Sequence, residues 1–209
     1  MNIRFVGTCV LAVLVCSCAS TSVKHTWKSP DYQGGPRTKL AVLTIEERGM
    51  LRQAFESRFA IQLRQQGASV VTTFDQLSLP EINRDKQAAA ALVQSAGAEA
   101  VVMLRLMDIS SSYNVTRPGP ERWASYVTGI ESGYWYDYYS VAFADMSPTY
   151  GNLKQKVFLE TSLFDLKTGK RLWTGLTQTV FTESMDRVAE MDQIVGKVLA
   201  AMRQDGVIP

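Results

Sequence analysis

The sequence is poor in the side chains that most often carry catalysis. It contains one histidine in 209 residues, His25, which lies in a polar stretch near the N-terminus. A Ser-His-Asp triad or a histidine-ligated zinc site therefore has no residue from which to be built. The motifs GxGxxG, GxxxxGK[ST] and GxSxG of nucleotide-binding and hydrolytic enzymes are also missing. We expect no catalytic residue, no metal and no cofactor, and hence no enzyme.

Cysteine is scarce too, because Cys9, Cys16 and Cys18 are the only three and all lie near the N-terminus. Arg4 and the apolar residues 5–16 have the charge and length of an export signal, since a membrane-spanning helix needs about 20 apolar residues. The Val-Cys-Ser-Cys site at residues 15–18 resembles the lipobox of bacterial lipoproteins. This resemblance implies a signal peptide over residues 1–17 and a lipid on Cys18, the first mature residue. A signal peptide cut after Ala19 and a retained membrane anchor are the alternatives.

Processing at that site would leave the mature chain without a free thiol, so its fold depends on core burial and not on disulfides. About 190 residues are enough for one such domain. The net charge of +2 provides no basic field for nucleic acid. Ala19 follows the lipidated cysteine where inner-membrane lipoproteins commonly carry Asp, so the resemblance points to the outer membrane, with the protein facing the periplasm.

Residues 18–38 are rich in Ser, Thr, Lys, Gly and Pro and show no apolar period. This composition predicts a lipidated tether between the membrane and the folded domain. Trp27 and Tyr32 interrupt the polarity of the stretch. We expect both rings to dock on the domain, with partner binding as the alternative.

Residues 39–209 predict a single periplasmic domain of the α/β class. Its first part alternates strands and helices, which predicts a βαβαβ unit with largely parallel strands at residues 39–46, 68–74 and 98–109 and helices at 49–66 and 85–96. The first of these helices should bury a stripe of Leu51, Ala54, Phe55, Phe59 and Leu63. An antiparallel hairpin at residues 155–165 and 171–182 and a last helix at 185–204 complete a mixed sheet with helices packed on it.

A long insertion at residues 117–150 separates the third strand from the hairpin and is rich in aromatic side chains. Loops of this length are uncommon in compact domains unless they are functional or disordered. Tyr and Trp dominate binding hot spots, so we identify a candidate partner-binding surface. Packing of the rings on the sheet and insertion into a bilayer are the alternatives. The candidate residues are Trp123, Tyr126, Tyr134, Trp135, Tyr136, Tyr138 and Tyr139.

Neighbouring acidic residues are the remaining material for catalysis. Glu46 with Glu47, and Glu81 with Asp85, could form a carboxylate site like that of a glycosidase only if they converged in a cleft. Their spacing does not imply a cleft, and we expect solvated faces. A carboxylate-based cell-wall hydrolase is therefore the least favoured function.

Two segments carry a family resemblance. Gly97 to Val101 (GAEAV) opens an apolar strand, and Asp165 to Trp173 contains an Asp-x-x-Thr-Gly-Lys-x-x-Trp pattern. Together with the order of elements over residues 27–208, they resemble bacterial envelope lipoproteins whose domains are similar to three groups: the amino-terminal domain of the Tol-system periplasmic protein, the curli secretion-channel lipoprotein and the lipoprotein activators of penicillin-binding proteins. The resemblance implies a non-enzymatic binding or assembly factor of the cell envelope, with an envelope protein or a second copy of the chain as partner. The alternative is a homo-oligomeric structural or secretion-channel subunit.

Overall fold

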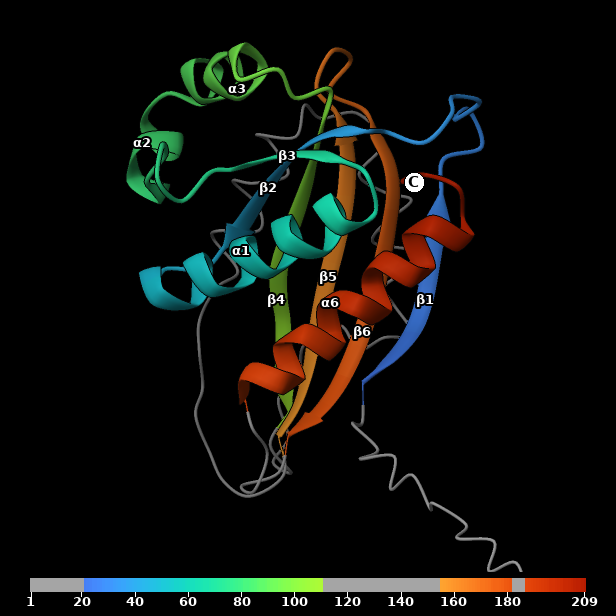
Figure 1. Ribbon diagram of the computed structural model, residues 1–209. Coiled ribbons are helices and arrows are strands. Elements are labelled where there is room, and N and C mark those ends of the chain that lie inside the picture. The colour runs from blue at the N-terminus through green and yellow to red at the C-terminus, as the bar shows by residue number, and fades with distance from the viewer. Residues whose placement is uncertain (1–20, 111–154, 182–186) are drawn as a thin grey trace, which may run out of the picture.

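The computed structural model describes residues 21–110, 155–181 and 187–209, in which six strands form one mixed sheet with helices on both faces (Figure 1). The strand order is β1-β6-β5-β4-β2-β3. The strands are β1 (Ser22–Lys28), β2 (Lys39–Ile45), β3 (Ser69–Thr72), β4 (Ala100–Ser110), β5 (Gln155–Asp165) and β6 (Arg171–Phe181). The helices are α1 (Gly49–Gln65), α2 (Leu79–Arg84), α3 (Lys86–Ser95) and α6 (Arg187–Gln204). The predicted α/β class is confirmed.

The parallel part of the sheet has β2 at its centre, paired in parallel with β3 on one side and β4 on the other. Leu40 and Val42 pack in the core beneath α1 and α6, whereas Ala41 and Leu43 pack in the core beneath α2 and α3. Burial on both faces explains why the strand is a continuous apolar run and not an alternating one.

The antiparallel part confirms the predicted hairpin. β5 lies between β4 and β6 and runs antiparallel to both, and the turn uses Gly169 at a φ of 71°. Left-handed backbone of this kind favours glycine because a Cβ atom would clash. The two strands of the hairpin lie between β4, in the parallel part of the sheet, and the edge strand β1.

The tether prediction is wrong for residues 22–28, which form β1 and pair antiparallel with β6. Four of the seven β1 residues are exposed and none is fully buried, so the strand has no apolar alternation to reveal it. Its conformation comes instead from backbone hydrogen bonds to β6. The docking of both rings is confirmed, because Trp27 packs against Leu176 and Tyr32 packs against the main core.

The stripe predicted for α1 is wrong in part. Phe59 and Leu63 are buried as expected, but the helix also buries Arg52 and Glu56, while Leu51 is only half-buried. A further difference is α2, which the sequence analysis did not identify. It is short and begins with a capping box in which Ser78 and Glu81 exchange hydrogen bonds.

Candidate functional site

The residues predicted to carry function lie outside the described residues. Cys18 precedes Thr21, the first described residue, and the seven candidate aromatic residues lie between Ser110 and Gln155. The structure does place the strands that flank them. β4 ends at Ser110 and β5 begins at Gln155, with Ser110 paired to Lys156. The aromatic segment therefore leaves and re-enters the sheet at one end.

The start of β1 lies at that same end of the sheet. Ser22 pairs with Gln178 near the last residue of β6, Phe181, which itself pairs with Gln155. We call this the Thr21 end, marked by Thr21, Ser110, Gln155 and Phe181, and we call the opposite end, with the turn at residues 166–170, the hairpin end. Figure 1 shows the Thr21 end at the bottom of the sheet and the hairpin end at the top.

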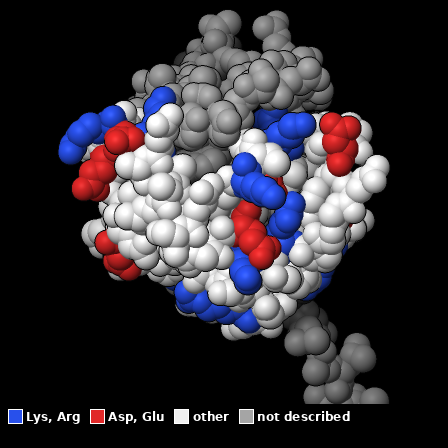
Figure 2. Space-filling model, turned by 90° about the horizontal axis from the view of Figure 1, so that it is seen from above, with Lys and Arg blue, Asp and Glu red and all other residues white. Residues whose placement is uncertain are grey.

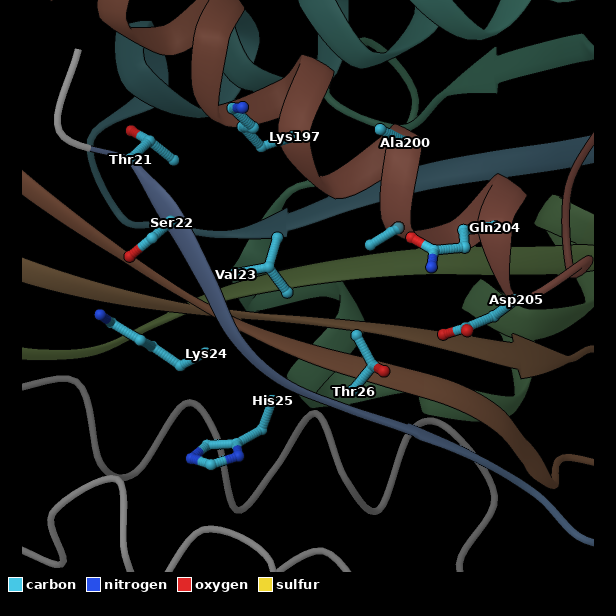
Figure 3. A pocket seen from close by; sticks show the side chains of 11 residues that line it. Thr21, Ser22, Val23, Lys24, His25, Thr26, Lys197, Ala200, Gln204 and Asp205 are labelled. Atoms are coloured by element: carbon cyan, nitrogen blue, oxygen red, sulfur yellow. The ribbon is translucent and has the colours of Figure 1, made fainter. Parts of the chain in front are cut away.

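A groove of about 590 Å³ runs between β1 and α6. Figure 3 shows Thr21, Val23 and Thr26 directed toward α6, whereas Lys24 and His25 point away from the helix. A β-bulge between Val23 and His25 explains this pattern, because it interrupts the alternation of the strand. The lining residues are Thr21, Ser22, Val23, Lys24, His25, Thr26, Lys197, Ala200, Ala201, Gln204 and Asp205.

The α6 side of the groove carries one cation and one anion, Lys197 and Asp205. Asp205 is already engaged, since Trp173 Nε1 donates to its carboxylate at 2.7 Å and Lys28 Nζ donates to its main-chain oxygen at 2.7 Å. Small and polar side chains make up most of the remaining lining. The groove therefore offers room for an extended chain and little charge with which to select an ion.

Thr21 closes the groove at the Thr21 end and is firmly held. The residue is 6% exposed, and its hydroxyl donates to Glu190 Oε1 of α6 at 3.0 Å. Because that donation uses the single hydroxyl hydrogen of Thr21, Thr179 of β6 donates the second bond, at 2.9 Å. The chain is therefore joined to both the sheet and the last helix from its first described residue.

Two carboxylates that the sequence analysis missed are fully buried. Glu160 accepts from Arg105 Nε at 2.7 Å, and the hydroxyls of Ser162 and Thr174 lie 3.3 Å from its other oxygen. This cluster spans β4, β5 and β6 on the sheet face opposite α6. Pairing across neighbouring strands is what brings the two charges together, since Arg105 is the register partner of Glu160.

Glu56 is the second buried carboxylate and connects α1 with the ends of β2 and β3. It accepts from the backbone N–H groups of Thr44, Thr73 and Phe74 at 3.0, 2.7 and 2.9 Å and from Arg52 Nε at 2.9 Å. The i,i+4 spacing of Arg52 and Glu56 was the available sequence signal. Both buried acids have their partners in place, which is the arrangement of structural ion pairs and not of a poised acid and base.

The acidic residues weighed as a carboxylate site serve local contacts. Burial by itself raises the pKa of Glu46, but hydrogen bonds and the charge of Arg48 outweigh it and bring the pKa below its usual range. Hydrogen bonds from Ser78 lower the pKa of Glu81 within the capping box, and Asp85 caps α3 by accepting from Ala88 N–H at 2.9 Å. These contacts stabilise helix starts and a loop.

Across residues 21–110, 155–181 and 187–209, no group of three or more His, Cys, Asp or Glu side chains is arranged to hold a metal ion. None of the helices described is long and apolar enough to cross a membrane. What the described part of the chain offers is an edge strand, a groove beside it and a well-defined point of entry at Thr21.

No family model and no curated protein sequence matches the chain. Three solved structures are similar to it. PelC from Paraburkholderia phytofirmans, solved as a dodecamer, matches 90% of this chain and 99% of its own at 13% identity and a TM-score of 0.50. A point variant of that PelC, also a dodecamer, matches 88% and 96% at 14% identity and a TM-score of 0.48. Lipoprotein GNA1162 from Neisseria meningitidis matches 79% and 97% at 14% identity and a TM-score of 0.39. At these identities the likeness to PelC shows a shared fold.

Proposed function

We propose that the protein is anchored to the outer membrane by a lipid on Cys18, faces the periplasm, and works without catalysis as a homo-oligomeric subunit in envelope assembly or secretion. The observation that carries this proposal is a fold shared with PelC over 90% of the chain, in a protein whose N-terminus resembles a lipoprotein signal. The PelC chain with this fold is a dodecamer. The same domain shape therefore supports self-association here.

The sheet supports a head-to-tail contact between copies. Its two edge strands, β1 and β3, lie at opposite ends of the strand order. A contact between the β1 edge of one copy and the β3 edge of the next would be heterologous, and such contacts build rings when the rotation closes. Edge strands are the natural places for this pairing because, in the described part of the chain, their outer backbone groups pair with no further strand of the sheet.

The oligomer is tested by native mass measurement of the acylated protein in detergent. We expect a species several times the 23.2 kDa chain mass, allowing for removal of the signal peptide and addition of the lipid. A monomer at every concentration would contradict self-association and would favour the alternative, a binding factor that acts on another envelope protein.

Photo-crosslinking in cells distinguishes these two functions and tests the aromatic segment. A photoreactive residue replaces Trp135, and a matched probe replaces Lys167, which is exposed in the hairpin turn. Adducts at multiples of the chain mass from position 135 support the oligomer, and a discrete heterologous adduct identifies the partner of a binding factor. Equal labelling from both positions would mean that residues 117–150 have no special role in contact.

The predicted membrane is tested by changing the residue that follows the lipidated cysteine. Ala19→Asp should move the protein from the outer to the inner membrane fraction, because an acidic residue there commonly retains lipoproteins. Ala19→Ser is the control and should leave the distribution unchanged. An unaltered distribution of the Asp variant would contradict sorting by this signal.

A further inference from the structure

We propose that the Thr21 end of the domain lies against the lipid surface and that the hairpin end points away from it. This orientation rests on the proposed lipidation of Cys18. It goes beyond anchoring, because an anchor on a long tether would leave the domain free to turn in any direction.

Thr21, the first described residue, is already part of the folded domain. The side chain of Thr21 is buried and hydrogen-bonded to both Thr179 and Glu190, and β1 starts at the next residue. A strand that pairs with β6 from Ser22 onward is part of the rigid sheet. Residues 22–28 therefore cannot lengthen a tether.

Few residues separate the lipid from Thr21. Three Cα–Cα steps separate Cys18 from Thr21, and at full extension they cover about 11 Å. The acyl chains on Cys18 would hold it at the level of the lipid headgroups. Thr21 is therefore kept within about 11 Å of that level, whereas a free tether over residues 18–38 could span about 70 Å.

The sheet is much longer than this reach. β5 runs from Gln155 at the Thr21 end to Asp165 at the hairpin end, and 11 residues of strand extend about 34 Å. The strand is therefore about three times as long as the extended chain from Cys18 to Thr21. The two ends of the domain are therefore at clearly different distances from the membrane unless the sheet lies flat on it.

The charge of the hairpin end opposes a flat arrangement. Figure 2 looks onto this end and shows basic and acidic side chains side by side. The strand register places Lys39 and Glu99 at this end, both exposed and 3.6 Å apart, and Lys167 is exposed in the turn itself. Exposed charges of both signs keep their hydration best away from a bilayer, so the domain stands on its Thr21 end.

The test uses the absence of thiols from the mature domain once Cys18 carries lipid. Lys156→Cys places a single thiol near the Thr21 end, and Lys167→Cys places one at the hairpin end; both positions are exposed. Each acylated variant receives the same fluorophore and is reconstituted into phosphatidylethanolamine–phosphatidylglycerol vesicles that contain a headgroup-spin-labelled lipid. We expect quenching several-fold stronger at position 156 than at position 167.

A second variant tests whether the short connection to the lipid sets the orientation. Inserting fifteen Gly and Ser residues between Ser20 and Thr21 adds a flexible reach of about 20 Å and should abolish the difference between the two positions. Equal or reversed quenching in the protein without the insert overturns the orientation alone, provided that mass spectrometry finds acylated Cys18. A Cys18 peptide without lipid overturns the proposed anchoring and the orientation with it.

Discussion

Replacing Gly175 by alanine should destabilise the protein because the added methyl group has no space. A Cβ atom at this position would lie 2.4 Å from Cη2 and 3.0 Å from Cζ2 of the Trp173 ring. The two residues are neighbours on one face of β6, and the ring is fully buried in the main core. The contact is therefore with a rigid group that is itself surrounded.

The magnitude follows from what holds the ring. Overpacking a core by one methyl group typically costs about 1–3 kcal/mol. Trp173 also donates to the Asp205 carboxylate at 2.7 Å, and a hydrogen bond to a charged group contributes about 1.5–3 kcal/mol that a displaced ring would lose in part. We expect Gly175→Ala to lower the free energy of unfolding by about 3 kcal/mol. For a domain of this size that is a fall in Tm of about 6–12 °C.

The assay is urea and thermal unfolding followed by circular dichroism and tryptophan fluorescence. Gly196→Ala is the matched control, because its Cβ atom would meet Gln62 Oε1 at an ordinary 3.5 Å. This second glycine lies inside α6, where alanine is favoured by about 0.5–1 kcal/mol, so the same substitution should stabilise. In a Trp173→Phe background, Gly175→Ala should cost less than it does in the natural chain, because the smaller ring leaves room for the methyl group. An effect of Gly175→Ala within 0.5 kcal/mol of zero would refute the reasoning.

Three further predictions concern the polar contacts. Glu160→Gln should lower the free energy of unfolding by about 3–5 kcal/mol, because it leaves the Arg105 charge buried beside a neutral amide. Replacing both Arg105 and Glu160 by Met should cost less than the sum of the two single changes. Additive costs, measured by urea unfolding, would contradict a coupled pair. Glu46→Gln should destabilise at pH 6, and this difference should shrink as the pH falls through the folded pKa of Glu46, which lies below its ordinary value of 4.5. A difference that grows on acidification would contradict the lowered pKa. Ser78→Ala should lower the free energy of unfolding by about 1 kcal/mol and speed the hydrogen exchange of the α2 amides. An unchanged exchange rate would mean that the capping box does not stabilise the helix.

Several elements could be predicted because their signals are local. The β2 segment is a continuous apolar run of strand-forming residues, and two-sided burial follows directly from it. In the hairpin, Gly169 occupies the position that needs positive φ, and the apolar residues on both sides alternate at the strand period. These patterns require no knowledge of distant parts of the chain.

The missed features depend on distant partners. Arg52 and Glu56 look like an exposed pair on a helix surface, and their burial follows only from backbone donors at Thr44 and Thr73. Glu160 is likewise buried because Arg105 lies opposite it on β4. In each case the charge is stable inside the protein only with its partner, and the partner is brought there by the sheet.

The sequence by itself determined the central strands, the hairpin and the class of the fold, because each of these is written in residues that are close together in the chain. It also predicts the lipid on Cys18 and the aromatic segment at residues 117–150. Only the tertiary structure decided that Ser22–Lys28 forms an edge strand and that Thr21 is already held in the folded domain. The physical reason is that β1 is held by backbone hydrogen bonds to β6 and by the contacts of Thr21 with Thr179 and Glu190, which leave no apolar pattern in the sequence of the strand.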